Sequence, residues 1–155
     1  MRILVLICSS IIGFSAIAQD DALYRDVNIT LFNEAQSCYK ESIQNQYRKA
    51  RTKKCAKTSL EIGKFLFEPD SQNIAALTYN YGKVAGGNEG KFILKTALVL
   101  YEAIHGKDSP ELIDLLIDLG EVSRALTIAK ESFGKESVLY ADVLLAEAIS
   151  GSSRV

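Results

Sequence analysis

The sequence of 155 residues contains no tryptophan, only two prolines and a single histidine. With so few prolines, long helices are permitted, because proline is the strongest helix breaker. One histidine without a cysteine cluster gives poor support for a zinc or other transition-metal site. The formal net charge of -1 argues against nucleic acid as a partner. The length and the ordinary hydrophobic content favour one compact domain.

The N-terminus carries one apolar stretch, residues 3–18, which follows Arg2. Small residues close it at Ala16–Ala18, where a signal peptidase requires them. This pattern predicts a signal peptide over residues 1–18, a mature chain that begins at Gln19, and export to the bacterial periplasm. The alternative is a membrane anchor, but the stretch is shorter than the roughly 20 residues of a spanning helix. We expect no transmembrane segment after signal removal.

Signal removal leaves two cysteines, Cys38 and Cys55, a natural disulfide pair in an exported chain. Helical periodicity over residues 29–67, with a polar and basic middle, predicts two helices joined by a turn near Asn45–Gln46. In an antiparallel hairpin the two cysteines lie about equally far from that turn and face each other. The alternative is two buried thiols on separate helices. One continuous helix would hold the sulfurs about 25 Å apart, at about 1.5 Å per residue.

The rest of the chain repeats itself at offsets of 38 and then 28 residues. Thr58–Ile62 corresponds to Thr96–Leu100 and to Arg124–Ile128. The same offsets align three further sets: Phe67–Ser71 with His105–Ser109 and Phe133–Ser137, Leu77 with Leu115 and Val143, and Gly82 with Gly120. Each copy predicts a helix, a turn and a second helix. Because one such pair cannot bury its apolar faces, stacked pairs must share a continuous core.

Turn chemistry supports this division. Gly106 and Gly134 are suited to left-handed helix C-caps, and the acid and serine that follow each of them are suited to N-caps. Pro110 fits the first turn of a helix over residues 110–120. The glycine-rich residues 85–90 predict a turn between helices, in preference to a phosphate-binding loop, because no strand precedes them.

The segment ALVLYEAIHGKDSPEL, residues 97–112, resembles the kinesin-light-chain-like variant of the tetratricopeptide repeat. The resemblance covers about residues 58–149, with residues 33–57 as a degenerate or capping pair. It implies an all-α fold, a short right-handed α-solenoid of stacked antiparallel helix pairs over residues 29–150. The segment 67–82 is also similar to the repeat part of exported bacterial TonB-family proteins.

Three parts depart from a regular array. Polar residues 19–28 predict a flexible lead-in, and residues 151–155 predict a disordered tail. The repeat spacing of 28 is shorter than the standard length, so the link near Glu121–Arg124 must be tight.

The tetratricopeptide resemblance implies that the first helix of each pair lines a concave groove that binds a protein or peptide. Carried over by position, the groove residues are Tyr79, Lys83, Asp114 and Glu121. The predicted function is that of a periplasmic binding scaffold or adaptor, without catalysis, cofactor or metal. The alternatives are a structural or self-assembling component of an envelope complex and an accessory repeat module of a TonB-type transport system.

An enzyme is the weakest alternative, because the polar residues do not form a catalytic pattern. His105 aligns with two phenylalanines and is expected at a helix end. Asp114 and Asp118 are one turn apart; acid–base chemistry or calcium binding is possible for such pairs, but a solvated helix face is the favoured interpretation. The basic early hairpin, residues 40–57, and the acidic residues 108–121 could attract one another between molecules, so self-association is a further expectation.

Overall fold

The computed structural model describes the backbone of residues 4–45 and 49–152, and the side chains of residues 23–45 and 49–149. The described residues form seven α-helices and one 3-10 turn, without a strand among them. The elements, in chain order, are α1 (Leu4–Gln44), α2 (Lys49–Leu66), α3 (Gln72–Ala85), α4 (Gly87–His105), η1 (Pro110–Leu112), α5 (Ile113–Leu119), α6 (Val122–Phe133) and α7 (Val138–Ser152). The prediction of an all-helical chain is therefore confirmed.

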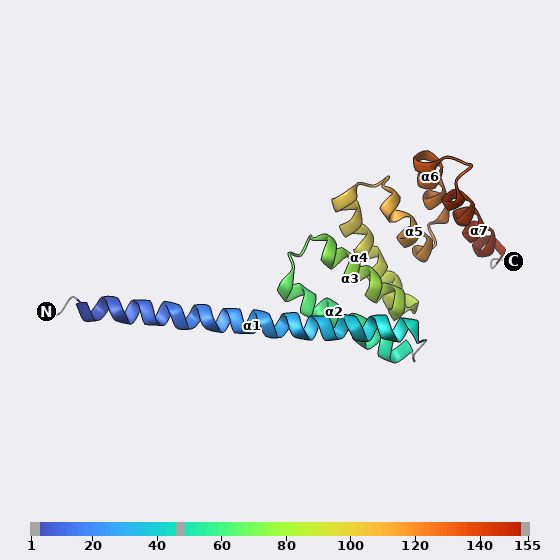
Figure 1. The fold of residues 1–155 in the computed structure, drawn as a ribbon. Coiled ribbons are helices and arrows are strands. Elements are labelled where there is room, and N and C mark those ends of the chain that lie inside the picture. The colour runs from blue at the N-terminus through green and yellow to red at the C-terminus, as the bar shows by residue number, and fades with distance from the viewer. Residues whose placement is uncertain (1–3, 46–48, 153–155) are drawn as a thin grey trace.

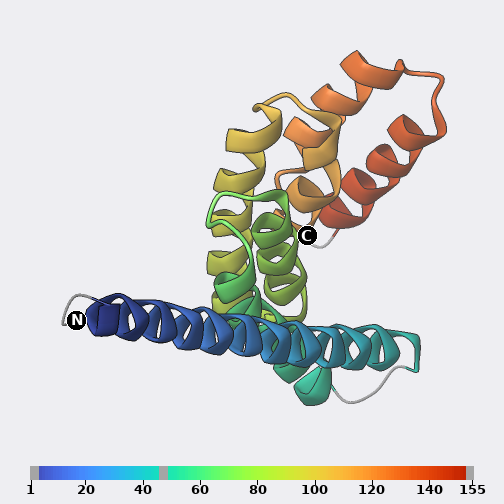
Figure 2. The ribbon, with the colours of Figure 1, turned by 60° about the vertical axis from the view of Figure 1, so that its left-hand side comes forward.

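Each helix packs mainly against its neighbours in the chain. The C-terminal half of α1 lies on α2, and its N-terminal half extends beyond the other helices (Figure 1). The pair α3 and α4 follows, then α5 and α6, and α7 ends the row, as a second view confirms (Figure 2). Within the residues that the structure describes, no helix combines the length and apolarity needed to cross a bilayer.

Helix α1 is longer than the sequence predicted. Residues 19–28, expected as a flexible lead-in, are helical and continuous with α1. The physical reason is that residues 14–44 contain neither glycine nor proline, so no strong helix breaker separates residues 19–28 from the rest of α1. At the other end, α7 includes residues 151 and 152 of the predicted disordered tail, and the remainder of that tail lies outside the described residues.

The sequence repeat corresponds to equivalent places in the fold. The aligned helices α2, α4 and α6 end at Leu66, His105 and Phe133, close to the predicted ends. Equivalent positions are also buried: Leu77, Leu115 and Val143 on α3, α5 and α7, and Ser59, Ala97 and Ala125 on α2, α4 and α6. The second set consists only of small residues, which allow neighbouring helix backbones to approach closely.

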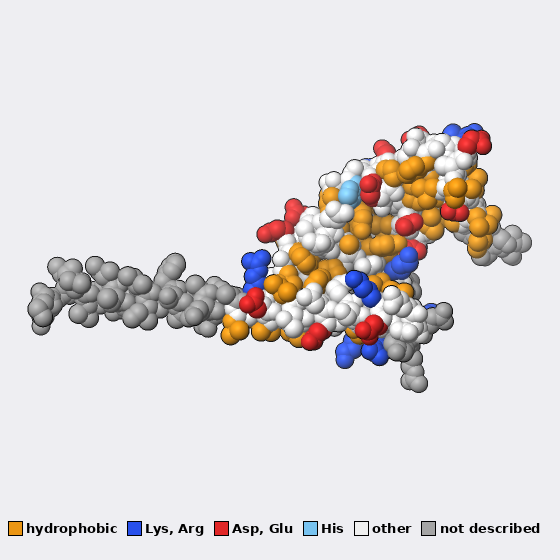
Figure 3. Space-filling model, viewed as in Figure 1, with side chains coloured by type: hydrophobic (Ala, Val, Ile, Leu, Met, Phe, Trp, Pro, Cys, Tyr) orange, Lys and Arg blue, Asp and Glu red, His pale blue; other side chains and the backbone are white. Residues whose placement is uncertain are grey.

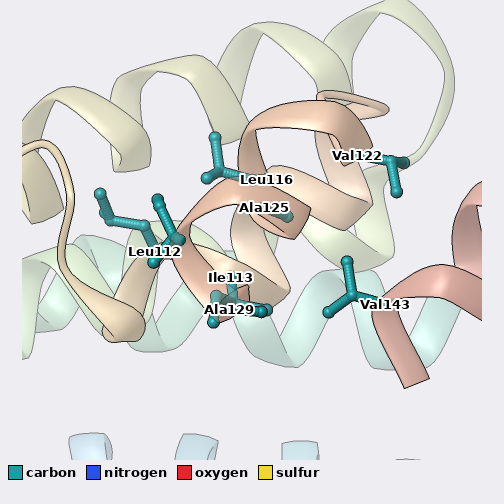
Figure 4. Close-up of a cluster of buried hydrophobic side chains, with 8 residues drawn as sticks. Leu112, Ile113, Leu116, Val122, Ala125, Ala129 and Val143 are labelled. Carbon is teal, nitrogen blue, oxygen red and sulfur yellow. The ribbon is translucent and has the colours of Figure 1, made fainter. Parts of the chain in front are cut away.

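The apolar interior is divided into clusters that follow the chain. One cluster joins α1, α2 and α3 and includes Tyr39, Leu60 and Leu77. Another, drawn in Figure 4, joins η1, α5, α6 and α7, and in it Leu112 and Leu116 are completely buried. Each such leucine contributes roughly 1.5–3 kcal/mol of burial free energy. Leu98 and Leu126, the repeat equivalents of Leu60, pack half-buried against this second cluster.

The serine N-caps are present in two of the three copies. The Oγ of Ser71 accepts a hydrogen bond from the backbone N–H of Ile74 at 3.4 Å. The Oγ of Ser137 accepts one from Tyr140 at 3.2 Å. The hydroxyl of Ser109 instead donates to the Glu111 carboxylate, so η1 begins without a side-chain cap.

The glycine C-caps differ from the prediction. Gly106 has φ 91° and ψ 160°, and Gly134 has φ 80° and ψ 162°, so both have positive φ but neither is in the left-handed helical region. Their extended ψ leads the chain away from the helix toward the next serine. The left-handed cap is Gly120, at φ 80° and ψ 15°. The N–H of Glu121 donates to the carbonyl of Leu116 at 2.8 Å, which closes α5. The link from α5 to α6 is thus tight, as predicted.

The predicted disulfide is present. Cys38 of α1 and Cys55 of α2 are bonded, with their Cα atoms 5.8 Å apart. α1 ends at Gln44 and α2 begins at Lys49, so the chain reverses close to the predicted turn at Asn45–Gln46, of which Gln46 lies outside the described residues. The cross-link joins α1 to α2 close to the turn between them.

Candidate functional site

A polar cluster joins α3 to α5, the first helices of the pairs α3–α4 and α5–α6. Tyr79 and Lys83 lie one turn apart on α3, and Asp118 lies near the end of α5. The Tyr79 hydroxyl donates to Asp118 Oδ2 at 2.7 Å. Lys83 Nζ donates to the Tyr79 hydroxyl at 3.2 Å and lies 3.3 Å from Asp118 Oδ2. The three groups therefore form a closed triangle between two helices.

Aromatic rings of α3 and α4 pack next to these three groups. Lys83 Nζ lies 5.3 Å from the centre of the Tyr79 ring, a cation–π distance. The Tyr79 ring packs edge-on against Tyr101 of α4 at 6.4 Å between centroids. Tyr101 in turn lies against His105 at 5.8 Å. The polar cluster thus rests on a row of rings from α3 and α4, which limits its side-chain freedom.

The environment keeps the Tyr79 hydroxyl protonated. Burial is the main cause that raises the pKa of Tyr79, followed by the hydrogen bond to Asp118 and by the negative charges of Asp118 and Asp114. Burial likewise raises the pKa of Tyr101. A protonated phenol beside a carboxylate acts as a hydrogen-bond donor and not as a base. The cluster is therefore suited to recognition and positioning.

Two hollows border the cluster and meet at Lys83. One, of about 430 Å³, lies between the α3–α4 turn and the end of α5, and Asp118 lines it. The other, of about 630 Å³, extends from Lys83 to the ends of α1 and α2, where Ser42 and Thr52 line it. Both are open to solvent. The side chain of Lys83 is 52% exposed and that of Asp118 is 28% exposed, so both charges can be reached from the hollows.

Gly86 and Gly87, at the junction of α3 and α4, line both hollows. Gly86 and Gly87 have φ values of 67° and 57°, which glycine adopts without strain. A Cβ on Gly90 would lie 2.7 Å from the carbonyl oxygen of Gly82, so α4 begins in direct backbone contact with α3. The turn is shorter than the predicted residues 85–90, because only Gly86 lies between the two helices and residues 87–90 form the first turn of α4.

The structure brings together most of the groove residues that the sequence predicted. Tyr79 and Lys83 are in contact, and Asp114 is close enough for its charge to act on Tyr79. Glu121 lies instead at the N-cap position of α6, with Oε2 3.9 Å from Nη1 of Arg124. The residue that sequence reasoning did not assign to the groove is Asp118. Its position one turn after Asp114 indicated a shared helix face but not a contact with α3.

The remaining candidate residues have structural positions. His105 ends α4, and its Nε2 is buried without a hydrogen-bond partner. Over the described ranges, no three acidic, histidine or cysteine side chains are grouped as metal ligands.

Comparisons of the chain with models of protein families, with curated proteins and with solved structures each return no match. The function is therefore inferred from the geometry of this chain.

Proposed function

We propose that this chain is an exported, tetratricopeptide-like scaffold that binds a polypeptide partner and carries out no catalysis. In this proposal the helix pairs form a short right-handed α-solenoid. The support comes from the helices, which pack with their chain neighbours, and from the repeat, which puts equivalent residues at equivalent buried positions. Such an arrangement presents the first helices of successive pairs side by side, as a binding surface requires.

The observation that carries the proposal is the position of Lys83 and Asp118. They lie on successive first helices, α3 and α5, at the border of two solvent-open hollows, and both remain partly exposed. A peptide in the groove would present an acidic group to Lys83 and a basic or amide group to Asp118 and Asp114. Because the row of tyrosine rings already holds these side chains, little further ordering is needed on binding.

A charge exchange tests this site. Partner capture from an envelope extract is compared for the wild type, Lys83→Glu, Asp118→Lys and the double exchange, with Lys64→Glu as a surface control from α2. Each single variant should lose the partner that the wild type captures. The double exchange restores the ion pair within the molecule but presents the wrong charges to the partner, so it should remain defective. Recovery of the partner by the double exchange would show that only local structure matters and would refute a binding role.

Export is the second part of the proposal and rests on the apolar residues 3–18 and the small residues at Ala16–Ala18. The expected mature protein begins at Gln19, with α1 shortened to Gln19–Gln44. N-terminal sequencing of the protein from the cell envelope tests this. A mature chain that retains residues 1–18 would contradict the signal peptide and favour the anchor.

A structural, self-assembling role is the alternative function. The specific observation in its favour is the exposed apolar side of α7, where Val138 is 78% exposed. An assembly unit would lose its role when that side is changed, and it would keep its role when Lys83 is changed.

A further inference from the structure

The C-terminal helix α7 is covered on one side only. Val143 points into the cluster shared with α5 and α6 and is fully buried (Figure 4). On the opposite side Val138, Leu145 and Ile149 are 78%, 61% and 63% exposed, and the neighbouring Leu144 is 41% exposed. The space-filling view shows hydrophobic side chains gathered at this end of the molecule (Figure 3). These residues are solvent-exposed in a single copy of the chain, and an apolar face of this kind is typical of an interaction site.

The internal repeat shows what covers this face in the other copies. The two offsets together carry Ala141, Leu144 and Ala148 of α7 onto the three buried α3 residues Ala75, Thr78 and Gly82. These α3 residues are buried because α4 runs back across them, so closely that a Cβ on Gly82 would lie 2.9 Å from Leu94.

The same holds for α5, the other equivalent helix. Its corresponding residues Ile113 and Leu116 are 2% and 0% exposed, in the cluster shared with α6. In both helices, then, an antiparallel helix covers this set of positions. In α7 the corresponding set is exposed.

We propose that a second copy of this chain covers α7, with the two α7 helices antiparallel across a two-fold axis. A two-fold axis perpendicular to a helix always makes the two helices antiparallel, which is the relation that the repeat requires. With the axis between Leu144 and Leu145, Ala141 lies opposite Ala148 of the second copy. Small residues then meet small residues at both ends, and leucines meet at the centre.

The chemistry of the face fits a second copy. Its residues are mainly apolar, namely Val138, Ala141, Leu144, Leu145, Ala148 and Ile149, and the exposed Asp142 lies at its edge beside Val138 and Ile149. A charged partner would find only the Asp142 carboxylate there, whereas the apolar residues are complementary to an identical apolar face. A helix of 15 residues is about 22 Å long, so the interface lies near the lower limit of specific interfaces, about 1,200 Å². We therefore expect a reversible dimer with a dissociation constant in roughly the micromolar range.

Sedimentation velocity of the full chain, from about 1 μM to about 100 μM, tests the dimer in the concentration range expected for an interface of this size. The wild type should shift from monomer to dimer. Leu145→Glu and Ala148→Glu each bury an unpaired charge and should weaken association at least about tenfold. Val99→Glu is the matched control, because Val99 is 66% exposed on α4, and it should dimerise as the wild type does.

Three results would overturn the proposal. The first is a wild type that stays monomeric over the whole range. The second is association that persists in Leu145→Glu, which would show that another surface, such as the N-terminal apolar residues 3–18, mediates the association. The third is a monomer that binds a different protein through α7, which would assign this face to another partner. Circular dichroism establishes that each variant is folded.

Cross-linking tests the register. In the proposed dimer, residues 145 of the two copies are offset by one residue along the helix axis, whereas residues 149 are offset by nine residues, about 13 Å. The cysteine variants are made in a Cys8→Ser background. Under mild oxidation Leu145→Cys should therefore form a covalent dimer, and Ile149→Cys should not. Equal cross-linking of both variants would rule out the two-fold arrangement.

Discussion

Removal of the disulfide between α1 and α2 should lower the free energy of unfolding by about 3 kcal/mol. Cys38 and Cys55 are separated by 17 residues. For a loop of this length, the loss of loop-closure entropy from the unfolded chain is worth roughly 3 kcal/mol. The perturbation is the double variant Cys38→Ala/Cys55→Ala. Alanine is chosen because Cys55 is buried and a serine hydroxyl would add a polar penalty of its own.

Urea unfolding followed by far-ultraviolet circular dichroism measures this loss. With an m-value of roughly 1–3 kcal/mol/M, the midpoint should fall by about 1 M or more. Cys8→Ser is the matched control, because Cys8 is not part of the disulfide, and it should leave the midpoint unchanged. Reduction of the wild type should reproduce the double variant.

The reasoning fails if the double variant unfolds within about 0.5 kcal/mol of the Cys8→Ser control, the usual effect of a neutral surface change. In that case the cross-link would not restrict the unfolded chain as the hairpin geometry requires. Titration of free thiols in the unfolded, unreduced wild type provides an independent check, since Cys38 and Cys55 should not react.

Two further predictions concern the first turn of α4. Gly90→Ala should cost about 1–3 kcal/mol, because its Cβ would lie 2.7 Å from the Gly82 carbonyl, and this clash exceeds the roughly 1 kcal/mol gain in helix propensity. Asn88→Ala in the same turn should be nearly neutral in the same unfolding assay, and equal effects of the two changes would contradict close packing. The hydrogen bond from Lys53, and then that from Tyr81, lower the pKa of the Glu89 carboxyl. Because the folded state favours its ionised form, this stabilisation is present above the ordinary pKa of 4.5 and is lost as the pH falls through the lower, folded-state pKa. Glu89→Gln should therefore lose less stability than the wild type between neutral and acidic pH, as measured by urea midpoints, and parallel pH profiles would refute this.

Local chemistry explains how much of the fold could be predicted. The ends of α4 and α6 were predictable because a glycine and then a serine follow each, and these residues act within a few positions of themselves. The length of α1 was not predictable from the polar composition of residues 19–28, because continuation depends on the absence of a breaker and on the helix before it. The conformation of Gly106 was predicted wrongly, because its ψ depends on the direction of the next segment.

The candidate site was predictable only within single helices. Tyr79 and Lys83 belong together because they are one turn apart on α3. The contact with Asp118 depends on the axial offset between α3 and α5, which no local pattern determines. Glu121 was placed in the groove by repeat alignment, but Gly120 ends α5 just before it and leaves Glu121 in the link to α6.

The packing of each helix against its chain neighbours also has a kinetic consequence. Contacts between residues close in sequence dominate, so the contact order is low and folding should be fast, with several helix pairs able to nucleate it. Local unfolding should begin at the C-terminal end, where α7 packs mainly against α6, and proceed inward. The cross-linked α1–α2 pair should resist it. Amide hydrogen exchange along the chain would appear as a gradient, with the fastest exchange in α7 and slower exchange toward the cross-linked α1–α2 pair.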